Sequence, residues 1–574
     1  MVRKTRSGTR TRLTAALILL TAASAFAQPI GSRDPLLNQG PKAVATAAGG
    51  MVATQLPNVT RAAVRVLEDG GNAVDAFVTA VFLQQVEDYH QVSHFGAMSG
   101  LYYEAATGTT TAFNAFSERP RADRCGEGKQ VGRLAIGGTV RGLESLAERF
   151  GTKPWAGYLE PAIAAAEQGI LVTNFQYANN YSLWENGDLI RENEEARAFY
   201  MPDGHLVPVG GIWKMPALAA TLRAVAARGA DHLYRGAWAR KFVEQATRRG
   251  FCVTLEDLAE YRTQWLEPAR FTYRGHEILV EPPPNKGGLL VGQNLNVLEQ
   301  FDLTATGHFA ASPETLEIMV RSFGKVESDM KWSIQDPAAY RNPTELWNSK
   351  EYARLSAEFV RQTMPQPGVD LTAAMEREAP EADAASSAMT LGSNHNVIVD
   401  AHGNWISSLH TGHGGAPGIF IDGVRATGSG VKSETTGPGR RILAEVTGVF
   451  VMKEGRPWLS LGTPGFPPQP VTEVLVNILD FGMHPKDAAD APRFWAFLYG
   501  QTERRVLRIE SRISEEVRRG MARSGIAMEE LGDYNWHTGS MQIIWRGDDG
   551  RLYGVSDPRR LGLAAGHSEE GGAP

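Results

Sequence analysis

The feature that most constrains the fold of this chain is a change in hydrophobic periodicity close to residue 390. Between residues 143 and 361 the apolar residues recur mainly at helical spacing, whereas beyond residue 394 they alternate with polar residues, as in half-buried strands. The intervening residues 373–389 are acidic, rich in Ala and Ser, and show no core periodicity. This composition predicts an exposed segment open to proteolysis, and a plain interdomain loop is the alternative.

Local patterns predict which helices and hairpins flank this change. Two helices are expected at residues 52–69 and 73–86, and the second is apolar nearly all round, which is typical of a buried helix. Four pairs of strands are expected, at 101–104 with 109–113, 394–400 with 405–410, 442–452 with 458–461, and 542–545 with 551–555. A further helix is expected at 471–481. Hairpins and helices segregated in this way predict an α+β fold of stacked antiparallel sheets and helices.

Residues 1–27 have the pattern of a secretory signal peptide. Five basic residues precede an apolar run at 13–23, and Ala25-Phe26-Ala27 forms a small-x-small cleavage site. The run is too short for a typical membrane span, although an uncleaved anchor is the alternative. We therefore expect a periplasmic or secreted protein with no membrane span after cleavage.

Charge and cysteine content narrow the function classes. The net charge of −6, which becomes −11 without residues 1–27, argues against a nucleic-acid partner. The two cysteines, Cys125 and Cys252, allow one disulfide at most, and the apolar surroundings of Cys252 predict an unreactive thiol. His402, His410 and His413 surround a glycine-containing turn, but their spacing enforces no metal site, and no cofactor or metal is expected.

The junction Gly392-Ser393 lies between the acidic segment and a predicted strand. A hydroxyl residue at such a position suits an N-terminal nucleophile hydrolase, in which the hydroxyl attacks the preceding carbonyl and chain cleavage frees a new α-amine. That amine has an ordinary pKa of about 7.7–8.0 and can act as the base for its own hydroxyl. From residue types alone, a serine that merely starts a strand is the alternative.

Motifs along nearly the whole chain resemble the γ-glutamyltransferase family, which includes glutathione hydrolases and related acylases. The matching stretches, in chain order, are residues 51–54, 67–76, 137–142, 393–400, 462–465, 490–494 and 552–559. The resemblance implies an αββα sandwich made by a large chain, residues 28–392, and a small chain, residues 393–574, that stay associated after self-cleavage. It also implies a small-molecule amide as substrate.

The resemblance places the chemical residues one by one. Ser393 stands where the family has its threonine nucleophile, with Thr390 as a competitor three residues out of register. The family's second threonine falls on Thr411, and the backbone N–H groups of its oxyanion hole fall on Gly465 and Phe466.

The residues that bind a γ-glutamyl group in the family are replaced here. The family's arginine reads as Phe116, with Arg119 three residues later as a possible substitute, and its asparagine reads as His413. Its aspartate falls near Ala426 or Thr427, and its paired serines read as Ala444-Glu445. If Glu445 points into the pocket, its carboxylate would repel a substrate carboxylate. We therefore predict that Phe116, Arg119, His413 and Glu445 contact the substrate.

These residues predict a secreted, self-processing amidohydrolase that forms an acyl-enzyme on Ser393 and prefers an acyl group other than γ-glutamyl. A true glutathione hydrolase or transpeptidase with a rearranged pocket is the first alternative. A non-catalytic binding protein on the same fold is the second alternative.

Overall fold

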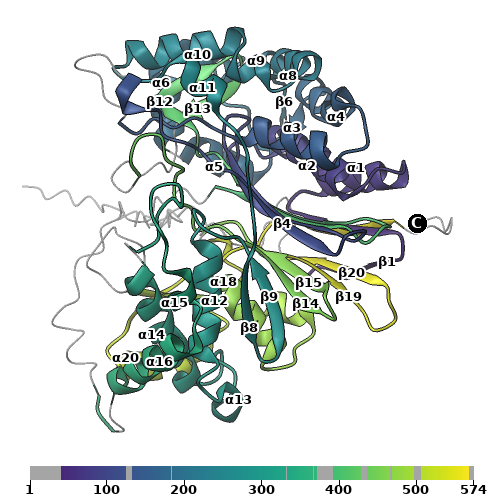
Figure 1. Cartoon of the computed structure of the whole chain (residues 1–574). Helices are drawn as coiled ribbons and strands as arrows, with labels where there is room; N and C mark the ends of the chain where they lie inside the picture. The colour runs from purple at the N-terminus through teal and green to yellow at the C-terminus, as the bar shows by residue number, and fades with distance from the viewer. Residues whose placement is uncertain are drawn as a thin grey trace, which may run out of the picture.

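The computed structural model describes residues 40–124, 132–182, 184–330, 333–365, 368–370, 392–427, 436–465, 468–496 and 506–567 (Figure 1). The predicted signal peptide, the acidic segment at 373–389, Thr390, Phe466 and Cys125 lie outside these residues. No helix in the described segments is both long and apolar enough to cross a membrane.

Two seven-stranded sheets form the centre of the molecule. The first sheet runs, in spatial order, through β21 (Leu563–His567), β2 (Gly50–Thr54), β10 (Asn394–Val399), β11 (Trp405–Thr411), β3 (Ala97–Glu104), β4 (Thr109–Ala115) and β7 (Gln264–Leu266). The second runs through β1 (Ala45–Ala47), β20 (Leu552–Ser556), β19 (Gln542–Arg546), β15 (Arg456–Gly462), β14 (Gly448–Lys453), β9 (His276–Val280) and β8 (Ala269–Tyr273). Neighbouring strands are antiparallel in both sheets.

The two sheets pack face to face. Their shared core combines side chains such as Val397 and Trp405 from the first sheet with Phe450 and Ile544 from the second. Burial of alternate side chains between two antiparallel sheets is the arrangement that the period-two patterns predict.

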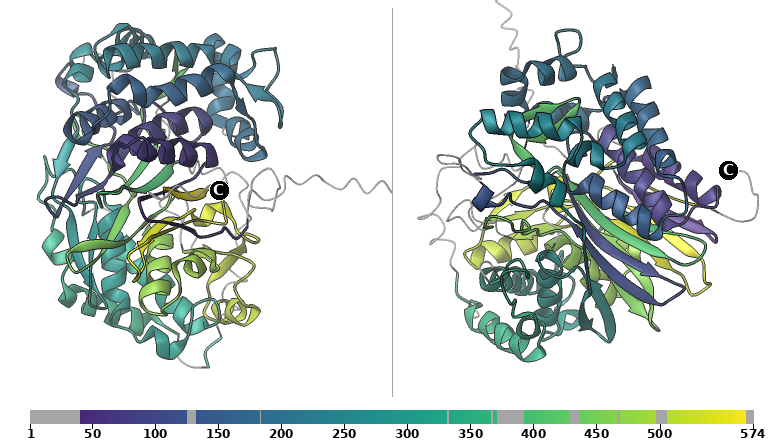
Figure 2. Two further views of the ribbon diagram at one scale, coloured as in Figure 1. Left: turned by 90° about the vertical axis from the view of Figure 1, so that its right-hand side faces the viewer. Right: turned by 45° about the horizontal axis from the view of Figure 1, so that its top comes forward.

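Helices cover the outer face of each sheet, as Figures 1 and 2 show from three directions. The helices over the first sheet include α1 (Pro57–Glu68), α2 (Ala73–Glu87), α3 (Thr139–Phe150), α4 (Trp155–Gln168), α8 (Pro216–Arg228) and α10 (Ala237–Arg248). Those over the second include α12 (Gly287–Leu298), α14 (Pro313–Met330), α16 (Lys350–Thr363), α18 (Pro468–Leu479) and α20 (Glu515–Arg523). The result is a four-layer αββα sandwich, which confirms the predicted fold class.

Shorter elements complete the two halves. The helices are α5 (Asn174–Ser182), α6 (Trp184–Glu192), α7 (Glu194–Tyr200), α9 (Asp231–Tyr234), α11 (Leu255–Glu260), α13 (Leu303–Thr306), α15 (Thr344–Trp347) and α19 (Pro485–Asp490). Two small sheets have two strands each, β5 (Ile170–Leu171) with β6 (Ile212–Trp213) and β12 (Gly415–Ile421) with β13 (Val424–Thr427). A third has three strands in the order β16 (Phe494–Ala496), β17 (Val506–Ile509) and β18 (Ala527–Glu530).

Several predicted elements need correction. The helix expected at 52–69 begins only at Pro57, because the residues before it pair as β2 in the first sheet. The strand expected at 442–452 begins at Gly448. Strands β7, β8 and β9 lie in the region where helical patterns predominate, and the sequence patterns did not reveal them.

Each sheet combines strands from before and after Ser393. In the first sheet β2 lies between β21 and β10, and β11 pairs with β3. In the second sheet β1 pairs with β20, and β14 pairs with β9. Five strand pairs therefore join the part of the chain before Ser393 to the part after it.

Cys252 is disulfide-bonded in the structure and so carries no free thiol. The only other cysteine in the sequence is Cys125. The disulfide, rather than the apolar surroundings alone, makes Cys252 unreactive as a nucleophile.

Candidate active site

The predicted nucleophile, Ser393, lies directly before β10, a strand flanked on both sides in the first sheet. β10 pairs with β11 so that Asn394 faces His410, and the next position along this ladder brings Ser393 opposite Thr411. Both side chains are buried, with exposed fractions of 4% for Ser393 and 1% for Thr411. The sheet register thus brings together the two hydroxyl residues that the sequence selected.

Both hydroxyls contact the carbonyl oxygen of Gly392. Thr411 Oγ1 donates a hydrogen bond to this oxygen at 2.8 Å, and Ser393 Oγ also donates to it. A hydrogen bond to a carbonyl oxygen draws electron density from the carbon and favours attack on it. Thr411 is therefore placed to polarise the Gly392–Ser393 peptide bond, beside the hydroxyl that would attack it.

Gln91 holds the peptide group of this bond from the other side. Its Oε1 accepts a hydrogen bond from the backbone N–H of Ser393 at 3.3 Å. Gly392 packs closely on the Gln91 backbone, since a Cβ added at Gly392 would lie 2.9 Å from the Gln91 carbonyl oxygen. Gln91 belongs to the loop between α2 and β3, and no motif in the sequence pointed to it.

A buried guanidinium binds the carbonyl of Ser393. Arg560 Nη1 donates to this oxygen at 3.2 Å and to Gln55 Oε1 at 3.3 Å. The guanidinium lies over the rings of Phe175 and Trp536, 5.4 and 5.1 Å from their centroids. Burial lowers the pKa of Arg560 to about 10, although Asp88 opposes this shift. The sequence motif at 552–559 ends one residue before Arg560, so this contact was missed.

The histidines near β10 are buried and neutral. Burial lowers the pKa values of His395 and His410 to about 3 and that of His413 to about 4. His395 Nε2 lies 3.0 Å from Ser407 Oγ. Within the described segments, no histidine forms a hydrogen bond with Ser393, so the geometry offers it no histidine base.

The glycine predicted for the oxyanion hole follows β15. Thr463 Oγ1 donates to the Pro464 carbonyl at 3.1 Å and accepts from the Ser540 backbone N–H at 2.6 Å, and Gly465 comes next with a left-handed φ of +91°. The end of β15 packs on β10, because a Cβ at Gly462 would lie 2.3 Å from His395 Nε2. The loop therefore starts beside β10, while Phe466, the other predicted donor, is outside the described residues.

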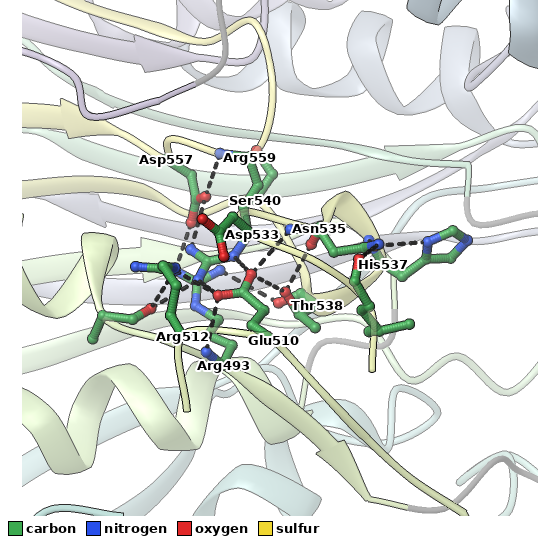
Figure 3. Close-up of polar contacts among 12 residues, drawn as sticks. Arg493, Glu510, Arg512, Asp533, Asn535, His537, Thr538, Ser540, Asp557 and Arg559 are labelled. Atoms are coloured by element: carbon green, nitrogen blue, oxygen red, sulfur yellow. Dashed lines mark hydrogen bonds and ion pairs between the residues drawn. The ribbon is translucent and has the colours of Figure 1, made fainter. Parts of the chain in front are cut away.

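A buried ion-pair cluster of Arg493, Glu510, Asp557 and Arg559 supports this loop (Figure 3). Arg559 donates to both carboxylate oxygens of Glu510 at 2.6 and 2.9 Å, and Arg493 lies 2.5 Å from Asp557. Glu510 Oε1 also accepts from Thr538 Oγ1 at 3.2 Å, two residues before Ser540. The cluster unites the motifs at 490–494 and 552–559 and orders the segment that binds Thr463.

Three of the altered binding positions gather in one apolar region. Phe116 and Ala444 belong to a buried cluster that also contains Ala97, Leu409 and Val446. The ring of Phe116 meets that of His413 edge to face, with centroids 6.4 Å apart. Since Ala97 faces Thr411 in the β3–β11 ladder, this apolar cluster adjoins the hydroxyl pair.

Two of the residues predicted to contact the substrate are charged, Arg119 and Glu445, and both side chains are largely buried. Glu445 Oε1 pairs with Lys286 Nζ at 2.7 Å, whereas its buried Oε2 has no hydrogen-bond partner in the described part of the chain, so the predicted contact of Glu445 with the substrate stays a prediction. Arg119 is 5% exposed, and its Nε and Nη1 atoms have no hydrogen-bond partner in the described part of the chain. Ala426 packs in the core under the helices of the first sheet, and Thr427 pairs with Gly415.

No three histidine, cysteine, aspartate or glutamate side chains converge as a metal site in the segments that the structure describes.

A hydroxyl residue at the start of a central strand of an αββα sandwich defines the N-terminal nucleophile hydrolase class. Residues 59–567 match the family described as Gamma-glutamyltranspeptidase, and this chain belongs to that family. The chain is thus an enzyme of the γ-glutamyltranspeptidase and acylase type, and the alternative of a non-catalytic binding protein is not supported.

The relatives of this chain include proteins named as glutathione hydrolases and proteins named as acylases. The chain is 28% identical to a glutathione hydrolase proenzyme of Escherichia coli (strain K12), over 90% of this chain and 92% of the relative. It is 29% identical to the acylase ACY 1 proenzyme of Pseudomonas sp. (strain SE83), over 90% of this chain and 93% of the relative. The fold matches a cephalosporin acylase from Bacillus halodurans with a TM-score of 0.77 and 23% identity, over 93% of this chain and 98% of that one.

Proposed function

We propose that this chain is an exported amidohydrolase that cleaves itself between Gly392 and Ser393 and then uses Ser393 as its nucleophile. The observation that carries the proposal is the pair of hydroxyls, from Ser393 and Thr411, on the carbonyl oxygen of Gly392. Residues 1–27 would be removed on export, and the disulfide at Cys252 supports an oxidising compartment.

Self-cleavage would begin with attack of Ser393 Oγ on the carbonyl carbon of Gly392. The amide C–N bond breaks, an ester forms, and the proton from the hydroxyl goes to the departing nitrogen. Water then hydrolyses the ester, which leaves a carboxylate at Gly392 and a free α-amine at Ser393. Thr411 and Gln91 would hold the carbonyl and the nitrogen in place during these steps.

Turnover would reuse the same groups on an external amide. The α-amine takes the proton of Ser393 Oγ as the oxygen attacks the substrate carbonyl, and it returns that proton to the leaving amine. The backbone N–H groups of Gly465 and Phe466 are the proposed donors to the oxyanion. Water, or a second amine, then releases the acyl group from Ser393.

The acyl specificity we propose is not γ-glutamyl. The Phe116 and Ala444 side chains, which stand where the family has an arginine and a serine, form part of an apolar cluster, and desolvating an unpaired carboxylate is costly. The names of two relatives, an acylase and a glutathione hydrolase, are compatible with either specificity. The buried Arg119 guanidinium, with two nitrogens unpartnered among the described residues, favours the γ-glutamyl alternative.

Mass spectrometry of the purified protein tests the processing step. We expect two chains, residues 28–392 and 393–574, with Ser393 at the amino terminus of the smaller one. A small chain that starts elsewhere, including at Thr390, would remove Ser393 from the role of nucleophile.

A set of three anilides tests the specificity. The kcat/KM values are compared for a γ-glutamyl anilide, its glutaryl counterpart, which lacks only the α-amino group, and a neutral acyl anilide. Two lost charged hydrogen bonds, each worth about 1.5–3 kcal/mol, predict a disadvantage of roughly a hundredfold or more for the γ-glutamyl compound. A tenfold preference for the γ-glutamyl compound would instead establish the glutathione hydrolase alternative.

A further inference from the structure

We infer that Arg560, opposed by Asp88, sets the basicity of the Ser393 α-amine in the processed enzyme. The inference rests on the function proposed above, because the α-amine exists only after cleavage at Ser393. Arg560 is a positioning residue in this scheme, since it acts through Ser393 and not on the substrate.

The geometry brings a fixed positive charge close to that amine. Arg560 Nη1 lies 3.2 Å from the carbonyl oxygen of Ser393. The nitrogen of the same residue is only two covalent bonds from the carbonyl carbon, which places the guanidinium within about 6 Å of the α-amine. A like charge at about 4–6 Å disfavours the protonated amine and lowers its pKa by roughly one to three units.

The charged groups around this position are the guanidinium groups of Arg560 and Arg425 and the carboxylates of Asp88 and Asp557. Asp88 and His90 come from the loop after α2, Arg425 comes from β13, and His413 follows β11. Burial lowers the pKa of His90 well below its ordinary value and that of His413 to about 4, so both rings are neutral at pH 7. Arg425 Nη2 donates to the His90 carbonyl at 3.2 Å. Two carboxylates interact with Arg560, Asp88 more strongly and Asp557 less, and Asp557 is also paired with Arg493 and Arg559.

Asp88 limits the effect of Arg560. Burial raises the pKa of Asp88 to about 6, so this carboxyl is mostly ionised above neutral pH and partly protonated below it. Removing the guanidinium should therefore raise the pKa of the α-amine, and removing the Asp88 charge should lower it. Two changes at one site with opposite signs distinguish charge tuning from a merely structural role.

The amine would also have a fixed acceptor. Gln91 Oε1 already accepts from the Ser393 nitrogen, and Gly392 leaves this side on cleavage. An amide oxygen cannot take up the proton, so Gln91 orients the amine and leaves its lone pair for the hydroxyl.

The test measures kcat/KM against pH for the wild type, Arg560→Gln, Arg560→Lys and Asp88→Asn, with Arg456→Gln as a control. Arg456 is an exposed arginine at the first position of β15. The acid limb of this profile reports the pKa of the base in the free enzyme. We expect the limb to rise by about one unit in Arg560→Gln, to stay in place in Arg560→Lys and Arg456→Gln, and to fall in Asp88→Asn.

Each outcome decides the inference. An unmoved limb in Arg560→Gln, or shifts of the same sign in Arg560→Gln and Asp88→Asn, would overturn it. If Arg560→Gln fails to mature, the limb of Asp88→Asn decides, because a limb at or above that of the wild type contradicts charge tuning. Mass spectrometry of the wild type separates the two proposals, since an intact chain overturns both, whereas a small chain starting at Ser393 with unmoved limbs overturns only this one.

Discussion

Removing the guanidinium of Arg559 should destabilise the folded chain by about 3–5 kcal/mol, because each of the two buried carboxylates loses one of its two arginine partners. Arg559 is fully buried and donates to Glu510 at 2.6 and 2.9 Å and to Asp557 at 3.2 Å. It also donates to the backbone carbonyls of Ala489 at 2.9 Å and Ala491 at 2.7 Å. An Arg559→Met change keeps part of the packing volume but removes all five hydrogen bonds.

The free energy of unfolding is measured by urea titration in a Ser393→Ala background, which keeps the chain in one piece under the proposed mechanism. The matched control is Arg354→Gln, which breaks an ion pair with Glu351 whose side chains are 56% and 69% exposed. Solvent screens such exposed pairs, so this control should change the free energy of unfolding little. If Arg559→Met cost no more than Arg354→Gln, the cluster would not be the support for the loops that we describe.

Three further changes test the site and its surroundings. Ser393→Ala should abolish both self-cleavage and turnover. Ser393→Thr should retain some of each, because threonine keeps the hydroxyl but adds a methyl that can cost about 1–3 kcal/mol. Gel analysis and an anilide assay check this, and turnover by the alanine variant would refute it. Gly392→Ala should slow self-cleavage, because its Cβ would lie 2.9 Å from the Gln91 carbonyl oxygen, while Gly157→Ala, with nothing within 4 Å, should cleave at the wild-type rate in the same time course. Burial raises the pKa of Glu281 to about 7, so the folded state holds a proton that the unfolded state releases above about pH 4.5, and stability falls as pH rises between these values. Glu281→Gln should therefore be more stable than the wild type at pH 8 by roughly 3 kcal/mol but not at pH 4, and equal pH dependence of the two unfolding free energies would contradict this.

Local sequence patterns were sufficient where the residues of a strand or helix follow a regular period or are apolar nearly all round, and these elements are buried on nearly all sides. The alternation in β10 and β11 and the all-apolar α2 predicted these elements nearly to the residue. Strands β8 and β9 were missed because they are short and lie among helices. They pair with each other, and β9 also pairs with β14, whose residues are about 170 positions away in the sequence. The order of strands in the two sheets is a property of these distant pairings and has no local signature.

The same limit applies to the site. Ser393 and Thr411 were found because each stands in a motif, and the register of β10 and β11 then brings them together. Gln91 and Arg560 reach Ser393 across 302 and 167 residues and belong to no motif, so only the folded chain reveals their contacts. The Lys286 partner of Glu445 has no signature in the sequence for the same reason.

Because each sheet combines strands from before and after Ser393, the proposed cleavage changes how the protein unfolds and refolds. Before cleavage, folding is a unimolecular process, and its equilibrium does not depend on protein concentration. Afterwards the same five strand pairs join two separate molecules, so unfolding becomes a dissociation, and the chance of refolding falls as the solution is diluted. The cleaved enzyme would then stay folded because its two chains separate slowly, and a sample that is unfolded and then diluted would not refold.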